Sequence, residues 1–427
     1  MLDLIIRNAN LPDGRKGIDI AVKNGRIVEV GPRLPMEAIR DIDAEGCLVT
    51  PPFVESHFHL DSTLSYGRPR VNESGTLLEG IEVWRELKTQ LTVENIKARA
   101  WELCRWAIAR GTLAIRSHVD VSDERLLAVQ ALLELREEIK SYIDLQLVAF
   151  PQDGYFRYGP NAANLERALD MGVDVVGGIP HFERTAGEGA ASIKALCELA
   201  AERHLRVDMH CDESDDPSSR HIETLTFHTQ RLGLHGRVTG SHLASMHSMD
   251  NYYVSKLIPL MAEAQMHVVA NPLINITLQG RHDTYPKRRG MTRVKELMEA
   301  GINVAFGHDA LMDPWYSFGS HDMLEVAHMA LHVAQMTGVD QMQQMFAAVT
   351  TNGAKALGLE GYGLEPGCHA DMVVLQASNP HEALRLKPAR LFVIRHGTII
   401  AQTPPVVSRV ELADRAFDVD FRFNGKI

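Results

Sequence analysis

Histidine and acidic residues recur in this chain where short runs of β-forming residues end. The first case is His57-Phe-His59, in which the alternation of an extended strand turns both imidazoles to one side and Phe58 to the other. Two imidazoles on one side suit a shared metal ion. With 20 histidines in 427 residues, however, such a pair is expected about once by chance, so the pair alone predicts little.

The ends of three later strands carry residues of the same type, in the segments Asp208 to Glu213, Ser241-His242 and His308-Asp309. Any one of these histidines, taken singly, would more often be a hydrogen-bonded core or surface residue. Four coincident strand ends favour a metal site instead. Three histidines and an aspartate offer a divalent metal a shell of nitrogen and oxygen with room for a water, as a hydrolase requires.

The fold must bring these strand ends together. The centre of the chain alternates apolar β-type runs with helical stretches such as Glu124 to Lys140 and Thr292 to Ala300, the pattern of a parallel sheet covered by helices. Eight units favour an α/β fold of the (β/α)8 TIM-barrel type, whose strand ends meet at one face, with an open doubly wound sheet as the alternative. The expected strands are Leu48 to Val54, Leu113 to Val119, Leu145 to Phe150, Val173 to Ile179, Leu205 to Met209, Arg237 to Ser241, His267 to Ala270 and Ile302 to Phe306.

Both ends of the chain predict short strands joined by tight turns, among them Asn24-Gly25 and His396-Gly397. We expect residues 1–50 and 371–427 to form one small β-sandwich domain. Residues 51–370 would then form the metal-dependent catalytic barrel.

Composition narrows the function further. The 44 basic and 55 acidic residues give a net charge of −11, which disfavours nucleic acid and anionic membranes as partners. The five cysteines are scattered and odd in number, which fits a reducing cytoplasm better than a disulfide framework. The charged N-terminus does not match a signal peptide, and no stretch of about 20 residues is apolar enough to span a bilayer. A cytoplasmic protein is expected.

Other common catalytic motifs are missing from the sequence. No GxSxG elbow, P-loop or GxGxxG segment follows an expected strand. The HxE and PCxxC signature of the zinc deaminases that act on polynucleotides is also absent.

The placement of these residues resembles the amidohydrolase superfamily, and five longer segments resemble the bacterial cytosine deaminase family within it. The likeness covers nearly the whole chain, and the segment from Asn271 to Gly290 is the most specific part. The five segments are Pro51 to Asp61, Val148 to Gly154, His210 to Glu213, Asn271 to Gly290 and Gly307 to Trp315.

The resemblance implies roles for individual residues. His57, His59, His210 and Asp309 would bind the metal. Glu213 would shuttle a proton to the ring nitrogen and to the departing ammonia. Asp309 would accept the proton of the attacking water, and His242 would hydrogen-bond the nucleophile and the tetrahedral intermediate.

Further roles concern the substrate and the number of metal ions. Gln152 offers a donor and an acceptor side by side for the amide-like edge of a pyrimidinone, and Trp315 would stack on the base or wall the pocket. His118 would support the ligands, and His181 receives no role. Two-metal members of the superfamily bridge their ions with a modified lysine, which the middle strands here lack. One divalent ion, Fe(II) or Zn(II), is therefore expected.

One residue departs from the family pattern. Directly after Asp309, where cytosine deaminases carry a second aspartate, this chain has Ala310. If this position faces the ring, the smaller side chain leaves space for a substituent of roughly methyl size, worth about 1 kcal/mol when filled. We therefore expect 5-methylcytosine to be accepted and converted to thymine, with plain cytosine as the alternative substrate.

Two other readings stay open. The same chemistry could serve another cyclic amidine, such as isocytosine, isoguanine, creatinine or an s-triazine. Some barrels of this superfamily are non-catalytic scaffolds that have lost their metal ligands, whereas this chain retains the full set. The resemblance also suggests a homo-oligomer.

Overall fold

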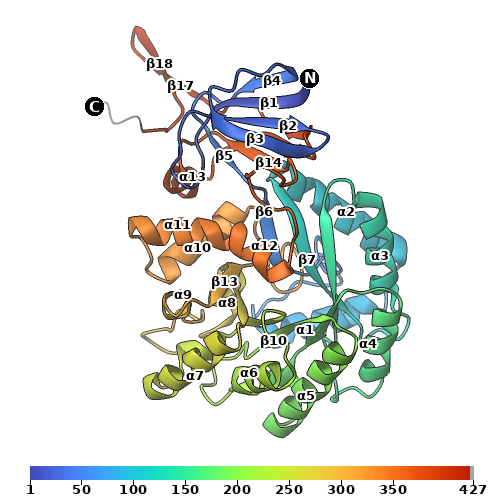
Figure 1. Ribbon diagram of the computed structural model, residues 1–427. Helices are drawn as coiled ribbons and strands as arrows, with labels where there is room; N and C mark the ends of the chain where they lie inside the picture. Colours follow the sequence, from blue (N-terminus) through green and yellow to red (C-terminus); the bar gives the residue numbers. More distant parts are fainter. Residues whose placement is uncertain (424–427) are drawn as a thin grey trace.

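Eight parallel strands form the centre of the protein, and each pairs with the next strand along the chain. The structure is a computed structural model that describes residues 1–423 (Figure 1). The barrel strands are β6 (Phe53–Phe58), β7 (Thr112–Asp120), β8 (Asp144–Phe150), β9 (Val175–Gly178), β10 (Arg206–Cys211), β11 (Val238–His242), β12 (His267–Ala270) and β13 (Asn303–Phe306).

The barrel closes between its first and last strands. Phe58 at the end of β6 forms a parallel bridge with Asp309, three residues beyond β13. The backbone N–H of Asp309 donates to the carbonyl of His57 at 2.9 Å, and the N–H of His59 donates to the carbonyl of Asp309 at 3.0 Å. The predicted (β/α)8 barrel is confirmed.

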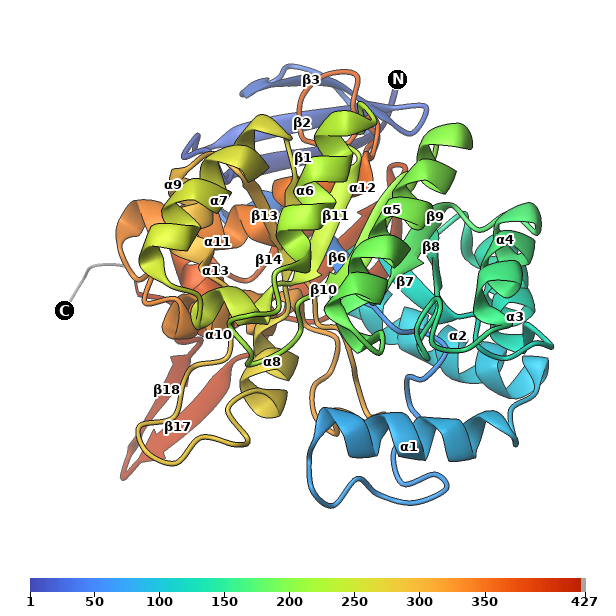
Figure 2. The same ribbon diagram turned by 90° about the horizontal axis from the view of Figure 1, so that it is seen from below.

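Helices surround the barrel, and their apolar sides pack against its strands in one continuous core (Figures 1 and 2). The predicted helices at 124–140 and 292–300 are present as α3 and α9. The helical elements of this part are α1 (Leu77–Lys88), α2 (Val93–Ala109), α3 (Leu127–Ile139), α4 (Asn161–Asp170), η1 (Pro180–Phe182), α5 (Ala186–Glu202), α6 (His221–Arg231), η2 (Ala244–His247), α7 (Asn251–Glu263), α8 (Pro272–Leu278), α9 (Val294–Glu299), α10 (Met323–Val333), α11 (Val339–Ala348) and α12 (Thr351–Leu357).

The chain ends build a small β-sandwich beside the barrel. One sheet has the order β3-β2-β1-β4 and the other the order β16-β15-β14-β5, and residues of both sheets share one buried apolar cluster. The elements are β1 (Leu2–Ala9), β2 (Ile18–Lys23), β3 (Arg26–Pro32), β4 (Ala38–Asp43), β5 (Leu48–Thr50), β14 (Met372–Leu375), α13 (Pro380–Leu386), β15 (Arg390–Arg395) and β16 (Thr398–Gln402).

The two predicted tight turns, Asn24-Gly25 and His396-Gly397, connect neighbouring strands of these sheets. Asn24 and Gly25 have φ angles of 52° and 72°, and His396 and Gly397 have 49° and 76°. Two successive residues with positive φ form the hairpin turn that matches the twist of the flanking strands. A last hairpin, β17 (Ser408–Leu412) and β18 (Arg415–Val419), extends away from the body (Figure 1). The final residues of the predicted small domain, 424–427, lie outside the described part.

The expected strand Leu48 to Val54 is wrong as one element. Leu48–Thr50 forms β5 and pairs with β14 of the small domain, whereas the barrel strand β6 begins at Phe53. Pro51 and Pro52 lie between them. Proline lacks the N–H that a strand donates, so the apolar run is divided between two sheets at this point. The division of the chain at residues 50 and 371 stays a prediction.

Residues 1–423 contain no helix with the length and apolar composition that crossing a bilayer demands.

Candidate metal centre and active site

Four side chains meet where the barrel strands end: His57 from β6, His59 just after it, His210 from β10 and Asp309 beyond β13. One ligand-type atom from each lies within 4.8 Å of the others. Oδ1 of Asp309 lies 3.2 Å from Nε2 of His57 and 3.3 Å from Nε2 of His59. Nε2 of His59 lies 3.0 Å from Nε2 of His210. The fold thus brings together all four residues predicted as ligands.

The backbone that carries these groups adopts an uncommon conformation. Asp309 and His242 both have a φ of 70°, in the left-handed region that residues other than glycine rarely occupy. Such residues cost about 1–3 kcal/mol each and persist where the surrounding fold determines them, often at functional sites. At Asp309 the determining contacts are the two hydrogen bonds that close the barrel.

Burial and mutual proximity set the charges of the cluster. Burial first, and then the neighbouring imidazole of His57, lower the pKa of His210 well below its usual value. Burial would raise the pKa of Asp309, but His57 and His59 outweigh it and hold this pKa well below its usual range. The cluster therefore combines a neutral imidazole with an ionised carboxylate, which are the forms that bind metal ions.

The donor atoms of the cluster fit a metal ion. Nδ1 of His57 and Nδ1 of His210 are buried and have no hydrogen-bond partner within residues 1–423, and Nε2 of His57 has only its 3.2 Å approach to Oδ1 of Asp309. Buried polar atoms are rarely left unpaired, because each costs roughly 1–3 kcal/mol. A mixed set of imidazole and carboxylate donors suits zinc and ferrous iron alike.

A second group of polar side chains adjoins the cluster. One ligand-type atom each from Glu213, His242 and Asp309 lies within 4.8 Å of the others, and Oε1 of Glu213 is 3.4 Å from Nδ1 of His242. Burial, followed by the charge of Asp309, raises the pKa of Glu213 well above its usual value. The carboxyl group can therefore hold a proton near neutral pH.

Two asparagines that the sequence analysis did not single out support this group. Nδ2 of Asn275 donates to Oε1 of Glu213 at 3.3 Å and contacts Nδ1 of His242 at 3.1 Å. Nδ2 of Asn271 lies 3.2 Å from the same ring nitrogen. Asn271 and Asn275 are four residues apart at the start of α8, which places them one helical turn apart on the same face. This spacing could have indicated them in the sequence.

A narrow pocket adjoins both groups, and its lining includes the three residues predicted to bind the substrate but not His242. Gln152 follows β8, Ala310 follows Asp309, and Trp315 lies further along the same loop. Gln152 and Ala310 are buried. Four apolar residues that the sequence analysis missed complete the wall, namely Leu77, Ile179, Ile274 and Leu278.

Trp315 is held from two sides. The carboxylate of Asp313 accepts the backbone N–H of Trp315 at 2.9 Å and that of Tyr316 at 3.0 Å. On the other side, a Cβ atom placed on Gly80 of α1 would lie 2.3 Å from Cδ1 of the indole. The ring therefore occupies space that is open only because residue 80 is glycine. Nothing in the sequence marks this contact, since Gly80 stands inside a helix and 235 positions before Trp315.

His118 lies behind the cluster rather than in the pocket. Its ring centroid is 4.1 Å from that of His57, and its Nε2 lies 3.6 Å from Oδ1 of Asp208. Asp208 also accepts hydrogen bonds from Arg116 at 2.9 Å and from Ser241 at 2.7 Å. Burial is the main cause that lowers the pKa of His118 to about 3, so this ring stays neutral.

His181 belongs to η1, after β9, and the structure does not bring it into the lining of the pocket. Burial lowers its pKa to about 4. No role follows from this position.

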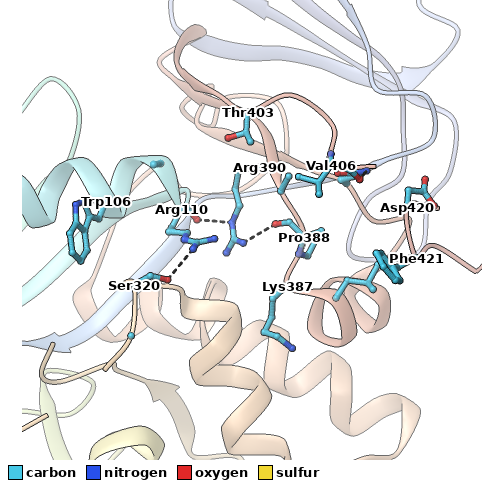
Figure 3. A pocket seen from close by; sticks show the side chains of 15 residues that line it. Trp106, Arg110, Ser320, Lys387, Pro388, Arg390, Thr403, Val406, Asp420 and Phe421 are labelled. Atoms are coloured by element: carbon cyan, nitrogen blue, oxygen red, sulfur yellow. Dashed lines mark hydrogen bonds between the residues drawn. The ribbon is translucent and has the colours of Figure 1, made fainter. Parts of the chain in front are cut away.

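A larger crevice of about 730 Å³ lies elsewhere, at the base of the β17–β18 hairpin (Figure 3). Arg390 and Arg110 point into it, but both are already engaged: Arg390 pairs with Asp322 at 2.5 Å, and Arg110 donates to Oγ of Ser320 at 3.0 Å. Both guanidinium groups thus have protein partners, whereas the converging ligand-type residues line the smaller pocket.

The fold and the converging side chains define a metal-dependent hydrolase built on a TIM barrel. A sequence profile described as the amidohydrolase family matches residues 40–408. The chain belongs to the amidohydrolase family.

Relatives of known activity are similar along almost their whole length. The crystal structure of 5-methylcytosine deaminase from Klebsiella pneumoniae liganded with 5-fluorocytosine is 42% identical, with a TM-score of 0.93, and covers 96% of this chain and 100% of that one. N-isopropylammelide isopropyl amidohydrolase from Pseudomonas sp. (strain ADP) is 32% identical over 95% of this chain and 99% of its own. Pterin deaminase from Rhizobium rhizogenes is 29% identical over 92% and 90%.

Proposed function

We propose that the protein hydrolyses the exocyclic amino group of a free cytosine-type base, converting 5-methylcytosine to thymine or cytosine to uracil and releasing ammonia. The observation that carries this proposal is the pocket itself. Gln152, Glu213 and Ala310 line one narrow space together with His59, His210 and Asp309 of the metal cluster. Its apolar wall and its few convergent polar groups suit a small planar base.

We further propose that His57, His59, His210 and Asp309 hold one divalent ion, Fe(II) or Zn(II). Such an ion supplies an activated water at neutral pH. The convergence of one ligand-type atom from each residue and the ionised carboxylate of Asp309 support this assignment. A single ion is proposed because the ends of β8 and β9 contain no lysine that could bridge two ions.

The protein's own side chains move the protons. Asp309 accepts a proton from the attacking water, and Glu213 donates a proton to the ring nitrogen. Glu213 then takes the hydroxyl proton of the tetrahedral intermediate and passes it to the departing amino group, which leaves as ammonia while the carbonyl forms. The proton left on Asp309 returns to Glu213 as the products leave. Burial raises the pKa of Glu213, which lets it hold the proton between the two transfers. His242 hydrogen-bonds the nucleophile and the tetrahedral intermediate, and Asn275 steadies both His242 and Glu213.

Three other lining residues, Gln152, Ala310 and Trp315, bind the base. Gln152 presents its amide oxygen and N–H₂ to the carbonyl and ring N–H edge of the pyrimidinone. Trp315 covers one face of the ring. Ala310, buried in the wall, leaves room beside the ring for a C5 methyl group. The likeness to a 5-methylcytosine deaminase at 42% identity supports the methylated base as a substrate.

Action on another cyclic amidine is the second candidate. The relative at 32% identity that is named for N-isopropylammelide favours it, because that compound is an s-triazine. Gln152 favours a pyrimidine over an s-triazine, because its amide offers a donor and an acceptor side by side for the edge of a pyrimidinone. The complete set of ligand-type residues argues against a non-catalytic scaffold.

We also propose that the protein acts as a homo-oligomer in the cytoplasm on a small-molecule base, without nucleic acid or membrane partners. The net charge of −11 disfavours nucleic acid and anionic membranes, and the free cysteines fit a reducing compartment. The homo-oligomer is proposed from the family resemblance alone.

The deciding experiment is an ammonia-release screen of free bases, with metal content measured on the same sample. We expect the highest kcat/KM for 5-methylcytosine or cytosine, and about one Fe or Zn per chain. A protein without metal that releases ammonia from no base would contradict the proposal. A clear preference for an s-triazine would favour the second candidate.

A further inference from the structure

Helix α1 borders the pocket although it is not a helix of the regular barrel repeat. It lies between β6 and α2 and crosses beside the loop that carries Trp315 (Figure 2). Leu77, at its first turn, lines the pocket. Gly80 and Trp84 follow on the same side: Gly80 faces the indole of Trp315, and the rings of Trp84 and Trp315 have centroids 6.2 Å apart. One face of α1 is thus part of the pocket wall.

The last turn of α1 is fastened by an ionic cluster. Nζ of Lys88 lies 3.0 Å from Oδ2 of Asp120 and 2.8 Å from Oδ2 of Asp153. Nε1 of Trp84 donates to the same oxygen of Asp120 at 2.9 Å, and Arg85 contacts Asp153 at 2.6 Å. The side chains of Lys88, Asp120 and Asp153 are only 12%, 4% and 14% exposed, so solvent screens their charges weakly.

The two carboxylates belong to the active-site end of the barrel. Asp120 is the last residue of β7, and Asp153 directly follows Gln152 after β8. Ser122 ties the two loops together, since its N–H donates to Asp120 and its hydroxyl accepts the N–H of Asp153. One ammonium group therefore joins α1 to the backbone on which Gln152 stands.

We propose that Lys88 is a positioning residue for substrate binding: by bridging Asp120 and Asp153 it fixes Gln152 on one side of the pocket and the α1 wall with Leu77 on the other. The proposal rests on the proposed function of this pocket. Removal of Lys88 would leave the buried carboxylate of Asp120 without its cation and Asp153 with Arg85 alone, and an uncompensated buried charge is strongly destabilising. Burial would lower the pKa of Lys88, but Asp120 and Asp153 together raise it to about 12, so the charge persists throughout the physiological range.

The test compares Lys88→Met, Lys88→Arg and Asp153→Asn with the wild-type protein. Lys88→Met should raise KM for the base about tenfold or more while kcat changes less than about threefold, since binding is affected more than chemistry. Metal content should stay at the wild-type value. Lys88→Arg keeps the charge and should recover most of the loss. Asp153→Asn leaves the pair of Lys88 and Asp120 in place and should shift KM in the same direction even if Lys88→Met folds poorly.

Hydrogen exchange provides a readout that does not depend on activity. Amide exchange should accelerate in residues 77–88 and 151–155 of Lys88→Met and stay unchanged in the rest of the barrel. The matched control is Lys97→Met, because Lys97 also bridges two carboxylates, Glu134 at 2.9 Å and Glu138 at 3.1 Å, but away from the pocket.

Unchanged KM and unchanged exchange in both Lys88→Met and Asp153→Asn would overturn the proposal. An equal rise of KM in Lys97→Met would also overturn it. Wild-type protein that releases ammonia from no base contradicts the proposed function instead. In that case the exchange of residues 77–88 and 151–155 still decides whether Lys88 holds α1 to the loop of Gln152.

Discussion

Nε2 of His59 lies 3.0 Å from Nε2 of His210, although the two residues are 151 positions apart in the chain. Two imidazole nitrogens at this distance can hold at most one proton between them, and His57 and Asp309 converge on the same point. Such convergence is typical of a metal site.

Removing one of these imidazoles should remove the metal. His210→Ala leaves three donors, and we expect substoichiometric metal and a loss of kcat/KM by a factor of about 10³ or more, as when a main electrostatic stabiliser is deleted. Metal analysis and ammonia release on the same preparation provide the measurement. His235→Ala, at an exposed position before β11, is the control and should retain both. Full metal content in His210→Ala would contradict the proposed ligand set.

Glu213→Gln should separate chemistry from binding. The amide keeps the size and the contact with Asn275 but cannot carry a proton, so kcat should fall by about 10²–10⁴ with little change in KM. The bound metal should remain. Steady-state kinetics and metal analysis check this, with Glu223→Gln on α6 as the control. A kcat within a factor of about three of the wild type would exclude Glu213 as the proton shuttle.

Ala310→Asp should change substrate preference. The larger, charged side chain fills the space beside the ring, so the ratio of kcat/KM for 5-methylcytosine over cytosine should fall about tenfold or more. Ala310→Gly, which leaves the space open, should keep the wild-type ratio. The same ratio in the aspartate variant would show that position 310 does not contact the C5 substituent.

Gly80→Ala tests the contact of α1 with Trp315. A Cβ atom at residue 80 would approach the indole to 2.3 Å, so the ring must move and KM should rise, by about tenfold if the face of the base loses its cover. The matched control is Gly187→Ala in α5, where the nearest atom to a new Cβ is 3.8 Å away. This exposed helical position should gain up to about 1 kcal/mol of stability and leave KM unchanged. Equal kinetics for both variants would contradict the role of Gly80.

His267 should make stability depend on pH. Burial lowers its pKa from 6.5 to about 4. The unfolded chain therefore binds more protons between these values, so stability is complete above about pH 6.5 and is lost as the pH falls toward 4. At 1.36 kcal/mol per unit, the loss is about 3 kcal/mol.

His267→Gln removes this titration, and the difference in unfolding free energy between pH 7 and pH 4.5 should shrink accordingly. Urea unfolding at several pH values measures it, with the exposed His235→Gln as the control. An undiminished pH dependence in His267→Gln would show that this imidazole is not the titrating group. His267 is the first residue of β12, at the end of the barrel away from the metal cluster, so the substitution does not touch the ligands and any metal loss at low pH should be the same in both proteins.

The sequence by itself determined the barrel and the polar residues at its strand ends. Alternation of apolar strands and helices is a local pattern, and a parallel barrel places the strand ends at one face whatever the loops do. For that reason His57, His210 and Asp309 could be predicted from their position at or just beyond the end of a strand. The boundary of the first strand could not, because the run from Leu48 to Val54 is apolar throughout and only pairing divides it between two sheets.

Only the tertiary structure decided the rest of the pocket. Leu77, Gly80 and Lys88 lie in a helix with no catalytic residue, and their importance comes from Trp315 and Asp153, which are distant in the chain. Apolar lining residues such as Ile274 have the same composition as core residues. Which of them faces a ligand depends on loop conformation, and that conformation results from contacts between remote segments that no local periodicity records.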